Sequence, residues 1–313
     1  MSPLVVVLGS LNMDFVVRVA SLPAPGETTL GDQFQMIPGG KGANQACAVG
    51  RLGGRAVQCA MAGRVGYDLF ADHLRASLSA AGVDVTGVHS TKSHPTGIAL
   101  ICVDRHGQNS IVVASGANGA VDSAAIAGYR TLFQAARYCL FQLEIPIPSV
   151  AEALTLARQI GVRTILDPAP AQPLAPELLA NVDILTPNES EACQLLGRPP
   201  ERIDPDEYRQ VAGALRRLGV RAVVLKLGDR GAFYFDGDTE LYQPAYQVDA
   251  VDSTAAGDVF NGALAVGLAE SKSREYSMRF AAAAAAISVT RLGAQSSVPM
   301  RSEVEDFLKS RAS

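Results

Sequence analysis

Short apolar runs alternate with amphipathic stretches along most of this chain. Runs of strand length occupy residues 4–9, 138–144, 163–169, 182–188 and 221–228. Their nearly continuous apolarity is typical of strands in a parallel sheet that is covered on both faces. Stretches such as 149–161 and 204–219 lie between these runs and are interpreted as helices. The alternation predicts βαβ units with right-handed crossovers.

Local signals refine some of these boundaries. Asp204 is a candidate helix cap, with Pro205 at the first helical position and Glu207 completing a capping box. Ser302 and Glu305 mark the last helix in the same way. The stretch YQVDAVDS, from residue 246, predicts a strand that ends at Asp252.

Two regions depart from this alternation. Residues 11–38 and 93–115 contain FVVRV, TGIALICVD and NSIVVAS, with turn residues between them and no long helix. They predict strands of a small accessory sheet. Such a sheet is well placed to cover a site at the carboxyl edge of the main sheet, where doubly wound folds bind their ligands.

Composition and charge narrow the class of protein. The 313 residues are 48% hydrophobic and 19% charged, which suits one large α/β domain or two small ones and excludes a disordered chain. A net charge of -4 without any basic run argues against a nucleic-acid partner. The five cysteines form no CxxC pair and the four histidines have no metal-ligand spacing. With no signal peptide and no membrane-length apolar run, a cytoplasmic protein with buried thiols is expected.

Polar groups follow several of the predicted turns and strands. Asn12 and Asp14 follow the first strand, Lys41 and Asn44 accompany a glycine-rich turn, and TPNESEA places Asn188 after another strand. Adjacent amide and carboxylate groups suit the vicinal hydroxyls of a sugar, but taken alone Asn12 and Asp14 are better explained by an Asx turn that leaves the strand. The glycine turn lacks P-loop spacing and alone is a weak signal. A magnesium–water site would use the same groups of the TPNESEA segment, but taken alone the segment is better explained by helix capping.

The stretch DSTAAGDVFNGAL combines small residues and acids at the start of an apolar helix. Ala255, Ala256 and Gly257 leave their N–H groups open to an incoming phosphate. Asp258, in the first helical turn, is either a partner of the helix dipole or a base beside an anion-binding site.

Taken together, these motifs resemble those of the ribokinases, within the PfkB family of carbohydrate kinases. The two signature segments of the family match GGKGANQA and DSTAAGDVFNGAL. GSLNMD, PAPGET, QLEIP, DPAPA, TPNESEA, LGDRG and TRLGAQSSVP also match ribokinase positions in order, so the resemblance covers essentially the whole chain.

The resemblance implies a ribokinase-like three-layer α/β/α sandwich, residues 1–313 forming a single domain with a small β-sheet lid. It implies ATP-dependent phosphorylation of D-ribose to D-ribose 5-phosphate with Mg²⁺, and a homodimer formed through the lid sheets. Asp258 would be the general base, and the backbone amides of Ala255, Ala256, Gly257 and Asp258 the anion hole. The implied sugar contacts are Asn12, Asp14, Gly40, Lys41, Asn44, Glu144 and Asp258. The implied nucleotide contacts are Asn188, Glu191, Lys226, Leu227, Gly228, Asp229, Arg230, Gly231, Gly257 and Ala282.

Ribokinases also hold a monovalent cation, usually K⁺, and the matching positions are Asp252, Thr254, Ser288, Arg291, Gly293 and Ser297. Three positions depart from the common pattern of the family. Lys226 stands where threonine is common, Ala282 where histidine or asparagine is common, and Ser253 where threonine is usual. These departures affect the nucleotide side, not the sugar set or the base.

The sequence is also compatible with several alternative functions. A relative of the same family could phosphorylate 2-deoxyribose, another sugar or a nucleoside. A non-catalytic sugar or nucleotide sensor could also keep the fold, although the intact Asp258 speaks against it. An oxidoreductase is excluded because no GxGxxG follows the first strand.

Overall fold

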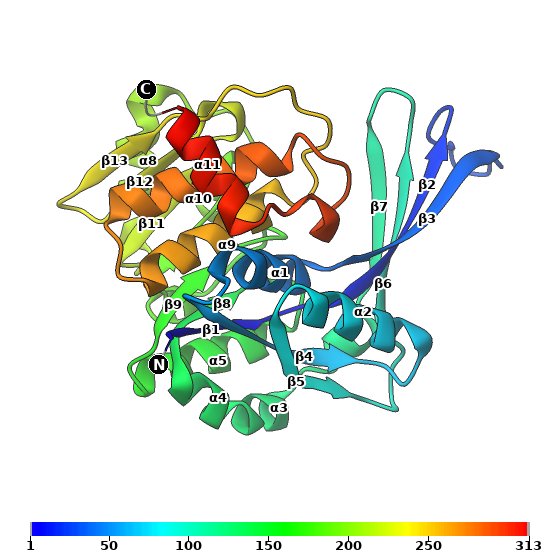
Figure 1. The fold of residues 1–313 in the computed structure, drawn as a ribbon, viewed down its shortest axis with the longest axis horizontal. Coiled ribbons are helices and arrows are strands. Elements are labelled where there is room, and N and C mark those ends of the chain that lie inside the picture. Colours follow the sequence, from blue (N-terminus) through cyan, green and yellow to red (C-terminus); the bar gives the residue numbers. More distant parts are fainter. Residues whose placement is uncertain (1, 312–313) are drawn as a thin grey trace.

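The computed structural model describes residues 2–311, which form a three-layer α/β/α sandwich with a second, smaller sheet (Figure 1). The main sheet has nine strands in the order β13-β12-β11-β10-β9-β8-β1-β4-β5. Its strands are β1 (Leu4–Leu8), β4 (Gln58–Val65), β5 (Val83–Ser90), β8 (Ala136–Phe141), β9 (Arg163–Leu166), β10 (Ile184–Leu185), β11 (Ala222–Lys226), β12 (Ala232–Phe235) and β13 (Glu240–Gln243). From β5 to β11 every pairing is parallel, whereas β12 and β13 are antiparallel. The predicted parallel sheet is confirmed.

Helices cover both faces of the main sheet. On β1, Val5 and Val7 contribute to one hydrophobic core, and Val6 and Leu8 to the other, so a continuous apolar run is required. The first core includes residues of α1 (Lys41–Gly53), α2 (Leu69–Ala80), α9 (Ala256–Ala269), α10 (Arg274–Ser288) and α11 (Arg301–Ser310). The second includes residues of α3 (Ser123–Gly128), α4 (Arg130–Ala135), α5 (Ile147–Gln159), α6 (Pro176–Leu179), α7 (Glu189–Leu195) and α8 (Tyr208–Arg217). Short 3₁₀ turns are η1 (Gly116–Ala120), η2 (Pro205–Glu207), η3 (Gly228–Arg230) and η4 (Gln295–Ser297).

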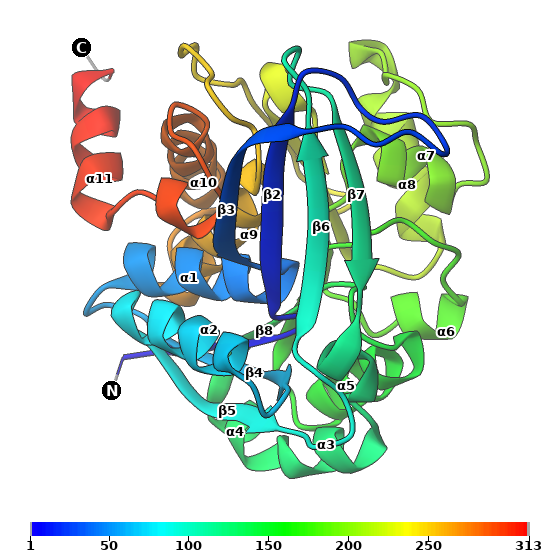
Figure 2. The ribbon, with the colours of Figure 1, turned by 90° about the vertical axis from the view of Figure 1, so that its right-hand side faces the viewer.

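The small sheet has four strands in the order β3-β2-β6-β7 and projects from the main body (Figures 1 and 2). Its strands are β2 (Asn12–Val19), β3 (Gly31–Gly39), β6 (Gly97–Val103) and β7 (Asn109–Ala114), within or close to the two regions predicted for an accessory sheet. The chain passes from the end of β1 at Leu8 into β2 at Asn12. The small sheet therefore grows from the carboxyl edge of the main sheet, where β1 ends.

The predicted strand from residue 246 to Asp252 is wrong. After Pro244 the backbone of this stretch is irregular, and the N–H groups of Val251 and Asp252 both donate to the carbonyl of Val289, at 2.7 and 3.1 Å. These donors are used at the end of α10 instead of in a β-ladder. Of the apolar residues in this stretch, Tyr246 packs edge-on against Phe307 of α11, whereas Val251 is 60% exposed.

Two predicted helix starts need correction. Asp204 precedes η2 but its side chain makes no capping bond, and α8 begins only at Tyr208. The last helix begins at Arg301, ahead of the predicted Ser302, because the carboxylate of Glu303 accepts the N–H of Met300 at 2.7 Å. The α-helix α8 thus starts three residues after Pro205, and the cap of α11 lies two residues before Ser302.

Cysteine burial agrees with the sequence expectation, since Cys47, Cys59, Cys139 and Cys193 are buried and Cys102 is partly exposed. Among the described residues, no helix combines the length and the apolarity needed to cross a membrane.

Candidate active site

Polar side chains gather where neighbouring strands of the main sheet end. Ser10 follows β1, Glu144 follows β8, Asp167 follows β9, Asn188 follows β10, and Lys226 is the last residue of β11. These strands are adjacent in the sheet and parallel, so their carboxyl ends meet at one edge. The helices α1 and α9 contribute further groups to the same edge, which is where open α/β sheets bind ligands.

The glycine-rich turn fits closely onto the end of β1. Gly40 has a φ of 89°, and a Cβ on Gly42 would lie 2.6 Å from the backbone nitrogen of Ser10. The close approach lets one oxygen of Glu144 accept from both the Ser10 hydroxyl, at 2.5 Å, and the Lys41 N–H, at 3.1 Å. The turn therefore fixes a carboxylate beside the start of α1.

Asp258 lies in the first turn of α9 with only 5% of its surface exposed. Gln45 donates to its Oδ1 at 3.0 Å and Asn44 donates to its Oδ2 at 3.2 Å, both from α1. Burial raises its pKa to about 6, opposed by Lys41 and reinforced by the charge of Asp167. A carboxylate with such a pKa is ionised near neutral pH yet able to accept a proton.

Asp14 and Asn12 lie two residues apart on β2 and therefore share one face of the strand. Burial raises the pKa of Asp14 to about 7, with further contributions from Glu144 and Asp258. The side-chain oxygen of Asn12 accepts from Asn118 at 2.7 Å.

Asn44 has an unpaired group in this site. Its amide nitrogen donates a hydrogen bond to Asp258, but its buried Oδ1 has no hydrogen-bond partner among the described residues. A buried acceptor without a donor is costly, so a ligand hydroxyl or a water is expected to complete it.

Two lysines reach this cluster of carboxylates. Lys226 Nζ lies 2.8 Å from Asp167 Oδ1, and a Cβ built on Gly257 would be 3.4 Å from that same Nζ. Its ammonium group therefore sits beside the start of α9. Burial works against the charge of Lys41, but the carboxylates of Asp258, Asp167 and Glu144 outweigh it and raise the pKa of Lys41 above its ordinary value.

The start of α9 presents unpaired backbone donors. Ala255 precedes the helix with a left-handed φ of 59°, and Ala256 N–H donates to the carbonyl of Ser253 at 3.2 Å. The N–H groups of Ala255, Gly257 and Asp258 donate to no acceptor within residues 2–311. Free N–H groups at a helix start, next to a lysine, are suited to hold an anion. The left-handed conformation of a non-glycine residue is typical of functional sites.

Asn188 and Glu191 form the capping box of α7. Glu191 accepts from the Asn188 backbone N–H at 2.7 Å and from its side-chain amide at 2.9 Å, while Asn188 Oδ1 accepts the Glu191 N–H at 2.8 Å. Burial raises the pKa of Glu191, against the opposing charge of Lys226. Each oxygen of Glu191 accepts one hydrogen bond and keeps a further lone pair, which is available to a Mg²⁺ ion or to one of the waters that this ion readily retains.

The turn from Lys226 to Gly231 closes through a hydrogen bond from Leu227 N–H to the Gly231 carbonyl at 2.8 Å. Within it, Arg230 pairs with Glu189 of α7, and Asp229 pairs with Arg202 at 3.1 Å. Gly228 has a φ of 59°. Ala282 is a buried residue of α10.

The positions that the family resemblance assigns to a monovalent-cation site lie on two segments of the chain, and the side chain of Asp252 connects them through hydrogen bonds. Its carboxylate accepts the N–H of Thr254 and the N–H of Gly293, both at 2.9 Å. The carbonyls of Asp252, Arg291 and Gly293 accept no hydrogen bond in the described part of the chain. Free carbonyls next to a carboxylate suit a large, weakly hydrated cation such as K⁺. The side chains of Ser288 and Ser297 bond to carbonyls of Ala285 and Ala294, and Arg291 pairs with Glu303.

Sequence reasoning missed three side chains that organise the site. Gln45 donates to both Asp167 and Asp258, each at 3.0 Å, and Asn118 bonds Asn12. Asp167 had a usable signal, since it follows a strand as Asn188 does. Gln45 and Asn118 had none, because their partners are more than 100 residues away in the chain.

Comparison with known proteins agrees with this geometry. The model of the pfkB family carbohydrate kinases matches residues 2–301. The ribokinase of Haemophilus influenzae is 39% identical over 305 residues, covering 97% of each chain. The crystal structure of ribokinase from Thermotoga maritima superposes with a TM-score of 0.89 at 40% identity, covering 98% of this chain and 99% of that one. The structure of Arabidopsis thaliana ribokinase complexed with ribose and ATP superposes with a TM-score of 0.90 at 35% identity, covering 99% of each chain.

A family match over nearly all of the chain, with relatives of this identity and coverage, leaves no ambiguity about descent. The carboxylates, lysines and open helix start described above lie within the matched residues. The chain belongs to the pfkB family of carbohydrate kinases.

Proposed function

We propose that this protein transfers the γ-phosphoryl group of ATP to the primary hydroxyl of D-ribose, giving D-ribose 5-phosphate and ADP. The observation that carries the proposal is the arrangement around Asp258. A carboxylate with a pKa of about 6 lies beside unpaired backbone N–H groups and the ammonium of Lys226. That combination offers a base for the hydroxyl and positive potential for the transferred phosphoryl group.

The sugar is held by Asn12, Asp14, Gly40, Lys41, Asn44 and Glu144. Asp14 projects from the small sheet and Glu144 from the main sheet, so the sugar lies between the two sheets. The orphaned Oδ1 of Asn44 accepts from one sugar hydroxyl, which removes the cost of leaving that oxygen unpaired.

In the chemical step, Asp258 accepts the proton of the attacking hydroxyl. The hydroxyl oxygen forms a bond to the γ-phosphorus as the bond to the bridging oxygen of ADP breaks. Negative charge on the transferring group is met by the N–H groups of Ala255, Gly257 and Asp258 and by Lys226. Ala256 contributes less than its neighbours, since its N–H already donates to Ser253.

On the nucleotide side, Asn188, Glu191, the turn of residues 226–231, Gly257 and Ala282 form the binding surface. Lys226 adds a positive charge where threonine is common in this family. Mg²⁺, bound with the phosphates, would neutralise charge on them and be oriented through water by Glu191. K⁺ would bind to the carbonyls and carboxylate around Asp252 and stabilise the backbone just before the anion hole.

Two copies of the chain associate through their small sheets. Phe34, Met36, Leu100 and Val112 are 59%, 50%, 50% and 63% exposed. Strand register places these four side chains on one face, because Phe15 pairs with both Met36 and Leu100, and Leu100 pairs with Val112. Asp14 lies on the opposite face, toward the sugar. An apolar face of this kind, next to the site, is suited to a partner copy.

The proposal is tested by a coupled assay of ADP formation with ribose, 2-deoxyribose, other pentoses and adenosine. Removing one hydroxyl that pairs with a buried polar group should lower kcat/KM by about ten- to a hundredfold. Ribose should therefore be the best substrate, and K⁺ should raise its turnover over Na⁺ at equal ionic strength. Equal or better use of 2-deoxyribose or adenosine would contradict the assignment of ribose.

A further inference from the structure

A cavity of about 420 Å³ lies at the edge of the main sheet opposite the candidate active site. Tyr138, Arg163, Ile184 and Ala222 line it, and each belongs to the amino-terminal part of its strand. The active site lies at the carboxyl ends of the same four strands. The volume falls in the range of about 300–1,000 Å³ that is typical of pockets for small organic ligands.

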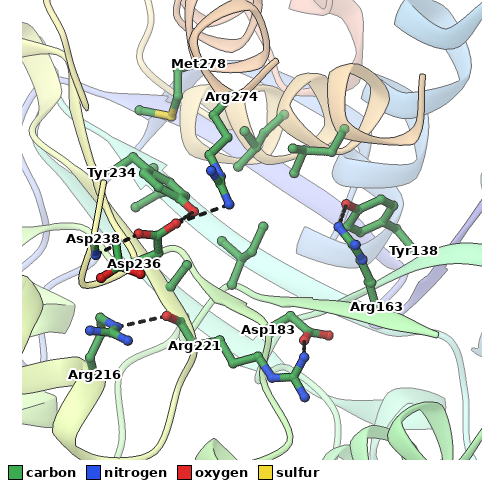
Figure 3. A pocket seen from close by; sticks show the side chains of 15 residues that line it. Tyr138, Arg163, Asp183, Arg216, Arg221, Tyr234, Asp236, Asp238, Arg274 and Met278 are labelled. Carbon is green, nitrogen blue, oxygen red and sulfur yellow. Dashed lines mark hydrogen bonds and ion pairs between the residues drawn. The ribbon is translucent and has the colours of Figure 1, made fainter. Parts of the chain in front are cut away.

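Apolar side chains form one part of the lining of this cavity. Ile184 and Val224 come from the sheet, and Leu264, Leu268 and Met278 come from α9 and α10. The rings of Tyr138 and Tyr234 also line it (Figure 3). This part of the lining is able to accommodate an aromatic or aliphatic body.

Four arginines also line the cavity, and two of them have carboxylate partners. Arg221 pairs with Asp183 at 3.1 Å and Arg274 pairs with Asp236 at 3.2 Å. Arg163 and Arg216 form no ion pair with any described residue. Arg163 donates to the hydroxyl of Tyr138 at 3.2 Å.

Arg216 is held in place without its charge being neutralised. Its Nε donates to the carbonyl of Arg221 at 2.9 Å and its guanidinium lies 5.6 Å from the centre of the Phe235 ring. Gly237 makes room for it, since a Cβ there would lie 2.2 Å from Arg216 Nη1. Asp238 is the one lining carboxylate without an ion pair among the described residues. Two unpaired guanidinium groups against one unpaired carboxylate leave the cavity with a positive balance.

We propose that this cavity is a binding site for an organic anion, with an aromatic or aliphatic body against the apolar side chains and a phosphate or carboxylate group on Arg163 or Arg216. Guanidinium groups bind such anions through paired N–H donors. Figure 3 shows Arg163 and Arg216 on different sides of the cavity, so the apolar body lies between them.

This site is separate from the catalytic one but shares its structural elements. β11 carries Ala222 and Val224 at the cavity and Lys226 at the active site. α9 carries Leu264 and Leu268 at the cavity and Asp258 at its other end. An anion in the cavity is therefore able to bind at the same time as ATP and sugar.

The test uses 1-naphthyl phosphate as probe, with binding measured by isothermal titration calorimetry on the full chain. A saturating non-hydrolysable ATP analogue and ribose are present, so that the active site is occupied. Binding of one probe per chain is expected under these conditions. Loss of one charge-assisted contact in Arg163→Gln or Arg216→Gln should weaken it about tenfold or more. The control is Arg217→Gln, an exposed arginine of α8 that does not line this cavity.

Each outcome decides the proposal. Neutral 1-naphthol should bind much more weakly than its phosphate, and circular dichroism should show that the variants are folded. No binding, full displacement by the ATP analogue, or equal affinity in all three variants would overturn the site. Equal binding of 1-naphthol and 1-naphthyl phosphate would overturn the assignment of an anion.

Discussion

The Asp258→Asn substitution distinguishes a catalytic base from a residue that only interacts with the helix dipole. If Asp258 is the base, the variant should gain stability and lose activity. Burial raises the pKa of Asp258 from an ordinary value of 3.8 to about 6. Between these values the folded protein keeps a proton that the unfolded chain has lost, so stability falls as the pH rises through this window. Above this pH range the buried carboxylate is ionised, and its full cost to the stability of the folded protein remains. Two pKa units correspond to about 3 kcal/mol as an upper value.

Asp258→Asn removes this cost because the amide carries no charge. The new NH₂ group would face a donor, either Gln45 Nε2 or Asn44 Nδ2. Rotation of the Asn44 amide resolves that conflict, since its Oδ1 has no partner and can accept. The variant should therefore be more stable than the wild type at about pH 8, by roughly 1–3 kcal/mol. A helix-dipole partner would instead lose about 0.3–1 kcal/mol on neutralisation.

Activity should change in the other direction. The amide keeps the shape of the side chain but cannot take the proton, so kcat should fall by roughly 10²–10⁴-fold. ATP binding should be largely retained, because the backbone N–H groups at the start of α9 are unchanged. Urea unfolding, steady-state kinetics and a nucleotide titration give the three quantities on the same preparation.

The matched control is Asp72→Asn, which removes an exposed carboxylate from the first turn of α2. It should lose a few tenths of a kcal/mol and keep full activity. If Asp258→Asn behaves like this control, with a small loss of stability and nearly normal kcat, Asp258 is structural and the base lies elsewhere.

Three further predictions follow from the geometry of the site. Because Asp258 must be ionised to act as base, kcat/KM should rise with pH around a midpoint of about 6, and Asp167→Asn should move that midpoint lower by removing a like charge; an unmoved midpoint would exclude the coupling. Lys226→Thr should raise the KM for ATP and lower kcat, together by roughly ten- to a hundredfold in kcat/KM, because the phosphates lose a cation beside the helix start; unchanged kinetics would mean that Lys226 serves only Asp167. Phe34→Asp should convert a dimer to a monomer in sedimentation velocity, and a dimer that persists would place the interface elsewhere.

The sequence by itself determined the features that depend on local patterns. The apolar runs specified strands buried on both faces, as the division of Val5 and Val6 between the two cores illustrates. The sequence predicted that Asn188 caps a helix, which α7 confirms, and the small residues after Ser253 predicted the start of α9. These signals lie within a few residues of one another, so the chain carries them without reference to its fold.

Tertiary structure alone decided how the site's charges interact. Gln45 bonds Asp258 across 213 residues of sequence and Asp167 across 122. The ion pair of Lys226 with Asp167, and the raised pKa values of Asp14 and Asp258, depend on burial and on distances of a few ångströms. Residues 246–252 illustrate the converse, since their alternating pattern suits a strand but the N–H groups of Val251 and Asp252 donate to Val289 at the end of α10. A local sequence pattern is compatible with more than one conformation, and the tertiary contacts of the segment determine which of them forms.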